Sequence, residues 1–148
     1  MSSATVQSPT AQDVVTIFAK WSDAVDKGDL QAFRRLYAPD AVLYVPLSPD
    51  PIGGRDAIWQ YETAMHEAFP AATLETHKPV VDHDTIAVEW TYAGRNTGPI
   101  ATLMRIIPAT NQLMSIRGVS FLHFKDGLIT QERRYYDVRS LYQQLGLQ

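Results

Sequence analysis

Apolar side chains in the first seventy positions recur three or four residues apart, which is the spacing of amphipathic helices. Three helices are predicted here. The first lies between the cap Thr10 and Gly28, the second begins at the cap Asp29 and ends at Pro39, and the third closes at Pro70. Their apolar stripes are Val14, Phe18, Trp21 and Val25, then Leu30, Phe33, Leu36 and Tyr37, then Ile58, Tyr61, Met65 and Phe69.

From residue 72 onward the apolar period changes to two, the period of strands. Strands are predicted over 72–81, 86–93, 100–107, 113–124 and 128–137, with an earlier one over 41–45, an irregular loop over 46–54 and a closing helix over 138–145. Turns are predicted at 82–84, 108–111 and 125–127, where Gly127 can take a positive φ. Helices followed by a meander of antiparallel strands predict an α+β domain: a cone-shaped curved sheet packed on three N-terminal helices.

Length and composition limit the class of protein. At 148 residues the chain is expected to be one domain over 10–148, preceded by a flexible tail over 1–9. A net charge of -3 and a pI near 5.7 argue against a nucleic-acid partner. The sequence has no cysteine, which excludes disulfides and thiolate chemistry. We expect a cytoplasmic protein with no membrane partner, because neither a signal peptide nor a membrane-spanning apolar run is evident.

The order of elements resembles the nuclear transport factor 2-like superfamily over nearly the whole chain, and within it the SnoaL-like polyketide cyclases. Each pattern that carries the resemblance is weak alone, but their joint order and spacing is specific. The patterns are Asp26-Lys27-Gly28-Asp29-Leu30, Tyr37-Ala38-Pro39-Asp40-Ala41-Val42, Gly53-Gly54-Arg55-Asp56-Ala57-Ile58, Pro108-Ala109-Thr110-Asn111, Asp126-Gly127-Leu128-Ile129 and Gln144-Leu145-Gly146.

The resemblance implies a set of catalytic positions, and this chain departs from all of them. The acid-base aspartate of the cyclases falls on Arg134, and so does the last-strand aspartate of the similar limonene epoxide hydrolases. The assisting His and Gln of the cyclases fall on Ser120 and Gly118. In the ketosteroid isomerase branch the base falls on Val45, and the two oxyanion donors fall on Trp21 and Ser120.

The two-residue period separates the faces of the last hairpin. If Ser120 and Arg134 hold the family's cavity positions, the inward side chains are Gly118, Ser120, Leu122, Glu132, Arg134 and Tyr136, joined by Ile86, Val88 and Trp90. His123 and Asp137 then face away, so we expect His123 to be a sheet-face residue at a dimer interface and Asp137 to cap the closing helix.

Glu132 and Arg134 are the candidate catalytic residues. Among apolar neighbours the pKa of Glu132 would rise toward the range that suits proton transfer, while Arg134 would hold it ionised. Arg134 could also stabilise an enolate or carboxylate oxygen. The plainer alternative is a salt bridge between these two residues across the cavity mouth.

Candidate substrate-binding residues surround this pair. They are Trp21, Tyr61, Glu62, Val88, Trp90, Ser120 and Tyr136. Glu62 is placed in this set although its helical position favours a solvated face. Trp59 is expected in the core or the cavity wall. His66, His77 and His83 are scattered, so no metal or other cofactor is expected.

Two functional interpretations remain open, with a third behind them. The first is a small cofactor-independent isomerase or cyclase that moves protons on an apolar polyketide- or terpenoid-like molecule. The second is a module without catalysis that binds a small apolar ligand or supports a homodimer, which the loss of every family acid favours. The third, an epoxide hydrolase, needs a further positioned carboxylate beyond Glu132.

Overall fold

The N-terminal helix forms as its capping residues predict. The computed structural model describes residues 8–102 and 104–147, so of the expected tail over 1–9 only Ser8 and Pro9 lie within the described residues. Helix α1 spans Ala11–Lys27. The hydroxyl of Thr10 accepts from the amide of Asp13, whose carboxylate in turn accepts from the amide of Thr10. Gly28 ends the helix at φ 66°, in the left-handed region.

The second helix is shorter than predicted. Helix α2 spans only Leu30–Arg34, and Tyr37 begins strand β1 (Tyr37–Tyr44) instead of completing a helical stripe. Strand β1 pairs in parallel with the last strand of the chain, β9 (Leu128–Tyr136), and the amide of Ile129 donates to the carbonyl of Leu36 at 2.9 Å. This pairing partner lies some ninety residues away in the chain, so the local period could not reveal it.

Helix α3 follows a short return strand. Strand β2 (Ile52–Gly53) pairs with β1, and α3 spans Arg55–Ala68. The third helix is therefore as predicted, but the segment 46–54 is not irregular throughout, because Ile52–Gly53 form β2. Within the described residues, no helix is long and apolar enough to cross a membrane.

The main sheet has the strand order β2-β1-β9-β8-β5-β3, with β4 also paired to β5. Its remaining strands are β3 (Thr73–Thr76), β4 (Val80–Asp82), β5 (Thr85–Arg95) and β8 (Leu113–Lys125). The strand expected over 72–81 is interrupted at 77–79, where Pro79 has no amide to donate. Helix α4 (Val138–Gln144) closes the chain, with the carboxylate of Asp137 accepting from the amide of Ser140 at 3.0 Å, so the predicted cap is confirmed.

The strand predicted over 100–107 is wrong. That segment is a separate small hairpin, β6 (Ile100–Ala101) paired with β7 (Ile106–Ile107), because Thr102 and Arg105 close a tight turn through their backbones and the Thr102 hydroxyl. Buried Asn96 ties the base of this hairpin to α3. Its amide nitrogen donates to the carbonyls of Ala68 and Gly98, and its oxygen accepts from Thr110.

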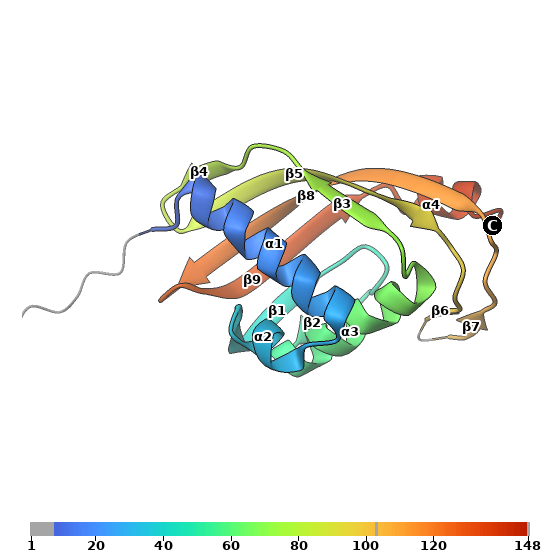
Figure 1. The fold of residues 1–148 in the computed structure, drawn as a ribbon, viewed down its shortest axis with the longest axis horizontal. Coiled ribbons are helices and arrows are strands. Elements are labelled where there is room, and N and C mark those ends of the chain that lie inside the picture. The colour runs from blue at the N-terminus through green and yellow to red at the C-terminus, as the bar shows by residue number, and fades with distance from the viewer. Residues whose placement is uncertain (1–7, 103, 148) are drawn as a thin grey trace, which may run out of the picture.

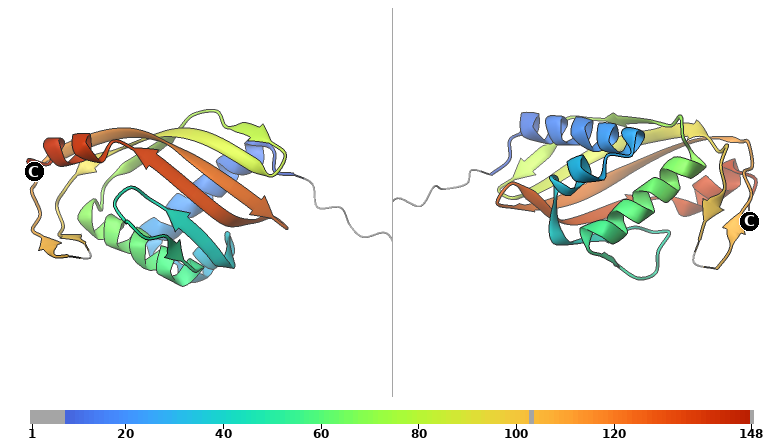
Figure 2. Two further views of the ribbon diagram at one scale, coloured as in Figure 1. Left: turned by 180° about the vertical axis from the view of Figure 1, so that it is seen from behind. Right: turned by 60° about the horizontal axis from the view of Figure 1, so that its bottom comes forward.

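The helices cover one face of the sheet. Figure 1 shows α1 lying across β5, β8 and β9, with α2 and α3 beside it against β1. Figure 2, seen from behind, shows that no helix crosses the opposite face of these strands. The sheet is mixed because the β1 and β9 pair is parallel, but the curved sheet on N-terminal helices agrees with the α+β prediction.

Candidate active site

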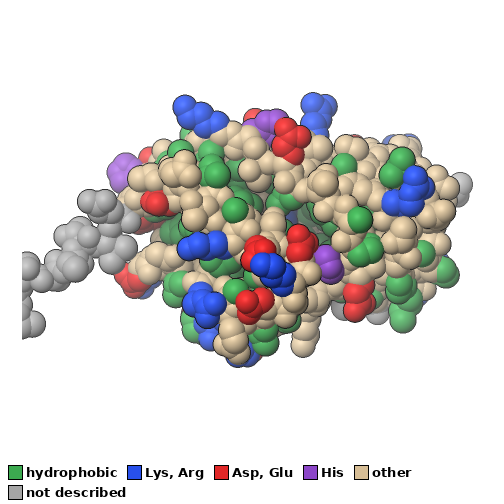
Figure 3. Space-filling view, viewed as in Figure 1, with side chains coloured by type: hydrophobic (Ala, Val, Ile, Leu, Met, Phe, Trp, Pro, Cys, Tyr) green, Lys and Arg blue, Asp and Glu red, His purple; other side chains and the backbone are tan. Residues whose placement is uncertain are grey.

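A cavity of about 390 Å³ lies between the helices and the concave face of the sheet. This size is within the range of small-molecule sites. The molecular surface is hollowed near its centre, with acidic side chains and a histidine around the opening (Figure 3). Most of the lining comes from α1, α3 and the inner faces of β5, β8 and β9, and the rest includes residues of β1, β3 and α4. Its aromatic members are Phe18, Trp21, Tyr37, Tyr61, Phe69, Trp90, Tyr92 and Tyr136.

The inward face of the last hairpin is the one expected from its two-residue period together with the family's cavity positions. Ser120 pairs with Arg134 across β8 and β9, Leu122 pairs with Glu132, and all four side chains line the cavity. Val88 pairs with Ser120 from β5 but does not line the cavity. It is 1% exposed and packs in the core, so its expected place in the substrate-binding set is wrong.

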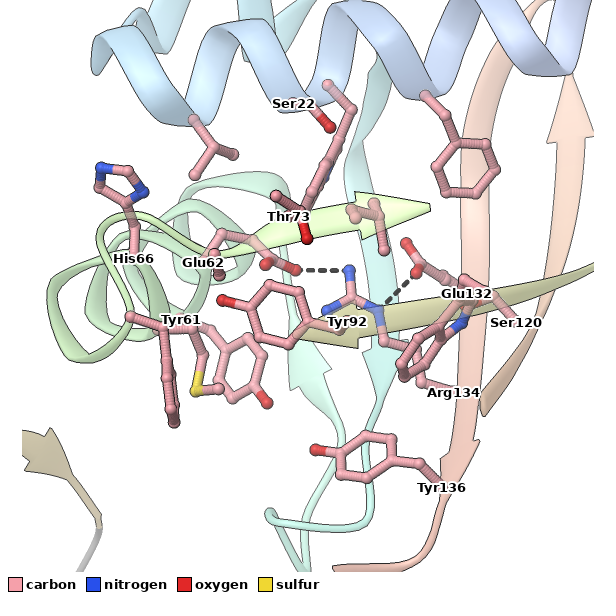
Figure 4. Close-up of a pocket in the computed structure, with 18 of the residues that line it drawn as sticks. Ser22, Tyr61, Glu62, His66, Thr73, Tyr92, Ser120, Glu132, Arg134 and Tyr136 are labelled. Atoms are coloured by element: carbon pink, nitrogen blue, oxygen red, sulfur yellow. Dashed lines mark hydrogen bonds and ion pairs between the residues drawn. The ribbon is translucent and has the colours of Figure 1, made fainter. Parts of the chain in front are cut away.

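Arg134 lies between two buried glutamates from different elements (Figure 4). Its Nε donates to Oε2 of Glu132, two residues along the same strand, at 2.5 Å. Its Nη2 lies 2.5 Å from Oε1 of Glu62, which projects from α3. Burial lowers the pKa of Arg134 but the two carboxylates more than offset this effect, so the pKa lies well above its ordinary value. The guanidinium therefore remains charged.

Both carboxylate oxygens of Glu132 have partners. Oε2 accepts from Arg134, and Oε1 accepts from the hydroxyl of Tyr37 at 3.1 Å. The side chain is 4% exposed. The expected salt bridge of Glu132 with Arg134 is therefore present, but it lies in the buried part of the site rather than across its mouth.

Glu62 is buried, at 4% exposure, and the solvated face that its helical position suggested is wrong. Its Oε1 is paired with the guanidinium of Arg134. Its second oxygen, Oε2, has no hydrogen-bond partner among the described residues. Burial raises the pKa of Glu62 above its ordinary value; Arg134 opposes this rise and Glu132 adds to it. Glu62 is thus the carboxylate in the site with free proton-accepting capacity.

Tryptophan side chains pack around this ion cluster. The guanidinium of Arg134 lies 5.7 Å from the ring centroid of Trp21, whose indole nitrogen is buried without a partner among the described residues. The indole of Trp90 donates to the hydroxyl of Ser120 at 2.9 Å. Ser120 therefore acts as an acceptor here, and its own hydroxyl hydrogen remains free to donate.

The tyrosines of the cavity remain neutral phenols. Burial is the main cause that raises the pKa of Tyr37, Tyr61, Tyr92 and Tyr136, and the negative charge of Glu62 adds to the rise in each. The sequence interpretation included Tyr61 and Tyr136 but missed the other two. The alternation of Tyr92 with Trp90 was a usable signal, whereas the helical interpretation of residue 37 hid Tyr37.

Several other expected residues lie away from the cavity. His123 faces outward and its Nδ1 lies 3.2 Å from the hydroxyl of Thr85. Trp59 does not line the cavity and packs against Phe33, with ring centroids 5.0 Å apart. His66, in contrast, lies at the cavity lining, with Nδ1 3.7 Å from Oδ1 of Asp26. Within the described residues, no group of three histidine, aspartate or glutamate side chains is placed to hold a metal ion.

A curved sheet that closes an apolar cavity over buried ionisable groups defines a class of small α+β proteins. The SnoaL-like domain model matches residues 18–132, and the chain belongs to this family. The match with the steroid Δ-isomerase of Nocardioides simplex is 35% identical over 71 residues, covering 48% of this chain and 58% of that protein. The chain thus spans little more than half the length of this curated relative.

Solved structures share the fold at low sequence identity. A candidate SnoaL-like polyketide cyclase from Jannaschia sp. CCS1 is similar with a TM-score of 0.79 and 17% identity, over 96% of this chain and 97% of that one. TsrD from Streptomyces laurentii has a TM-score of 0.75 and 22% identity, over 91% of this chain and 96% of that one. A third similar structure is a Catenulispora acidiphila protein with a ketosteroid isomerase-like fold, in complex with trimethylamine. It has a TM-score of 0.69 and 19% identity, over 89% of this chain and 93% of that one.

Proposed function

We propose that the protein is a small cofactor-independent isomerase or cyclase that moves a proton on an apolar carbonyl compound, of polyketide or terpenoid type, with Glu62 as the acid-base group. The observation that carries this proposal is a buried carboxylate of raised pKa, with one oxygen open, beside a guanidinium in an apolar cavity. Family membership and the steroid isomerase relative support the reaction class.

Glu62 suits proton transfer better than Glu132 because of their partners. Both oxygens of Glu132 already accept hydrogen bonds, from Tyr37 and Arg134, so neither is open to a proton from a substrate. Glu62 is paired with Arg134 through Oε1 alone, so its Oε2 is open to accept a proton from a substrate. Glu132 then serves to hold Arg134 in position.

Arg134 would stabilise the charge that proton removal creates. Its Nη1 has no partner among the described residues and can donate to a substrate carbonyl oxygen. Glu62 takes a proton from the carbon next to the carbonyl, the C–H electron pair forms the enolate C=C bond, and the negative charge moves to oxygen. The net charge of the site does not change, because the charge leaves Glu62 and reappears at the oxygen, both beside Arg134. Return of the proton at another carbon completes an isomerisation.

A binding module without catalysis is the second candidate, favoured by the loss of the usual family acids at Arg134 and Ser120. The Catenulispora structure shows that a protein of this fold can bind a basic amine. A homodimer through the uncovered sheet face stays a prediction, to be tested by light scattering of the purified chain. Tyr135, 54% exposed, lies on that face.

Hydrogen exchange at the carbon next to a carbonyl tests the proposal. A panel of cyclic ketones with a β,γ double bond is incubated with the protein in D₂O, and exchange and isomerisation are followed by proton NMR. We expect catalysed exchange, reduced about 100-fold or more in Glu62→Gln. The matched control is Glu67→Gln, which makes the same change on the same helix at an exposed position. Exchange by Glu62→Gln at the wild-type rate would show that Glu62 is not the acid-base group.

A further inference from the structure

The negative and positive charges of the side chains that line the cavity are unequal in number. Among the described lining residues the carboxylates are Asp26, Glu62 and Glu132, and the guanidinium of Arg134 is the only permanent cation. His66 adds a positive charge only when it is protonated, and it faces Asp26 near the mouth. With all carboxylates ionised, three negative charges stand against one positive charge, so the cavity has a negative surplus.

Only the buried part of this surplus of negative charge is shielded from screening by water and salt. Asp26 is 67% exposed on its side chain, so water and salt screen it. Glu62 and Glu132 are both 4% exposed on their side chains and share the single charge of Arg134. Both oxygens of Glu132 accept hydrogen bonds, whereas only Oε1 of Glu62 is paired, so the unbalanced charge lies at Glu62. A carboxylate ligand would be repelled from this position, whereas a cation would be attracted.

Aromatic rings surround the same position. The ring of Trp21 already accepts the Arg134 guanidinium at 5.7 Å, so a cation is compatible with this wall. Tyr61 and Tyr92 lie on the Glu62 side of the cluster (Figure 4), and Glu62 affects both phenols electrostatically. Trp90 and Tyr136 extend the wall with an edge-to-face contact at 5.8 Å. Ring faces and a carboxylate are the groups that bind organic ammonium ions.

We propose that the cavity selects ligands that carry a basic nitrogen, seating an organic ammonium group between Glu62 and the aromatic wall, with the apolar body of the ligand filling the rest of the cavity. This inference deepens the proposed function and rests on it in taking the same cavity as the substrate site. The substrate class becomes carbonyl compounds with an amine substituent rather than carboxylic acids. The ammonium group supplies the positive charge that the cluster lacks.

Three benzyl compounds that differ in charge test the proposal. Benzyltrimethylammonium carries a permanent positive charge, neopentylbenzene is its neutral isostere, and phenylacetate carries a negative charge. Binding of each to the purified full chain is measured at pH 8 by titration of tryptophan fluorescence and, for the two soluble ions, by calorimetry. We expect the cation to bind at least about 10-fold more tightly than the neutral isostere, and phenylacetate to bind more weakly than both.

Glu62→Gln shows whether the selectivity comes from this carboxylate. The variant keeps the volume of the side chain and leaves the bond of Arg134 with Glu132 intact, so its fold is expected to persist, as circular dichroism can verify. The preference for the cation over the neutral isostere should fall to less than 2-fold in Glu62→Gln and stay at the wild-type value in Glu67→Gln. Equal affinity of the wild type for the cation and the neutral isostere, or full cation selectivity in Glu62→Gln, would overturn the inference.

The inference and the proposed function can fail separately. Cation selectivity that depends on Glu62, without ketone exchange, would leave a binding module and reject the catalysis. Exchange that depends on Glu62, with no preference for the cation, would keep the catalysis and reject the ammonium site. Each outcome is read from a different measurement on the same two variants.

Discussion

Glu62 and Glu132 are both buried beside Arg134, and their partners give them different chemistry. Glu132 could be found from the sequence because it lies two residues before Arg134 on one strand, and residues two apart on a strand share a face. The inward position of Glu62 depends on how α3 is rotated against the sheet. Its local pattern does not determine that rotation, because a glutamate at the edge of an apolar stripe can face either way. The site was therefore predictable in part: the strand period placed the cation and one carboxylate, Glu62 was included without a pattern that fixed its direction, and Tyr37 was missed.

Replacing Arg134 with Met tests the electrostatic role of the cation at the residue scale. Two buried carboxylates would lose their shared partner, and we expect a loss of about 3–5 kcal/mol in the free energy of unfolding at pH 7. Arg134 has 14% side-chain exposure, so solvent screens it little. Both carboxylates of the variant would favour their protonated forms, so its stability should increase as the pH falls from 7 to 5. Urea unfolding at the two pH values measures this change.

The neighbouring Arg133→Met is the control for that experiment. Arg133 lies on the same strand but on the outward face, with its guanidinium 5.4 Å from the ring of Phe121. We expect its loss to change the stability by no more than about 1 kcal/mol, with no recovery at low pH. A similar cost for both variants would mean that the buried ion cluster has no special role in stability.

At the scale of elements, prediction succeeded where the local residue pattern alone determined the helix or strand. The long strands β5, β8 and β9 alternate between faces over nine or more residues, and α1 has both of its caps in the sequence. The prediction failed at β6 and β7, where the apolar residues of 100–107 looked like one strand. A turn closed by Thr102 and Arg105 divides it, and Asn96, from outside the segment, bonds to Ala68 and Gly98 at the base of the hairpin. Tyr37 was likewise misassigned to a helix because its strand pairs with β9, far along the chain.

Gly118 provides an element-scale prediction, because it creates the space in which Trp90 lies against β8. A Cβ at position 118 would be 2.6 Å from Cη2 of Trp90 and 2.7 Å from the carbonyl oxygen of Tyr135. We expect Gly118→Ala to displace Trp90, break its bond with Ser120 and cost about 1–3 kcal/mol. The shift of the Trp90 indole signal in a ¹⁵N NMR spectrum and urea unfolding measure both effects.

Gly53→Ala is the matched control for this close approach. A Cβ at position 53 meets nothing within 4 Å, and we expect this variant to change the stability by less than about 0.5 kcal/mol. An unchanged Trp90 signal in Gly118→Ala would show that the strand pair adjusts without moving the cavity wall. In that case the glycine would not be what positions Trp90.

At the scale of the whole molecule, the buried carboxylate of Glu62 carries a cost in stability. The folded state raises the pKa of Glu62 above its value in the unfolded chain, mainly through burial. Between these two pKa values the folded state therefore binds more protons than the unfolded state, and the free energy of unfolding falls as the pH rises. Buried groups retained against stability are typical of functional sites.

Glu62→Gln should therefore be more stable than the wild type at neutral pH, because glutamine is never charged. The advantage should shrink as the pH falls through the folded-state pKa of Glu62 and vanish near the ordinary pKa of glutamate, about 4.5. Urea unfolding of both proteins from pH 4 to pH 8 measures the difference directly. Glu67→Gln removes the same charge from the exposed side of α3 and should show no such trend. If Glu62→Gln is less stable than the wild type at pH 8, the carboxylate is a structural partner of Arg134 and its proton is not free to serve a reaction.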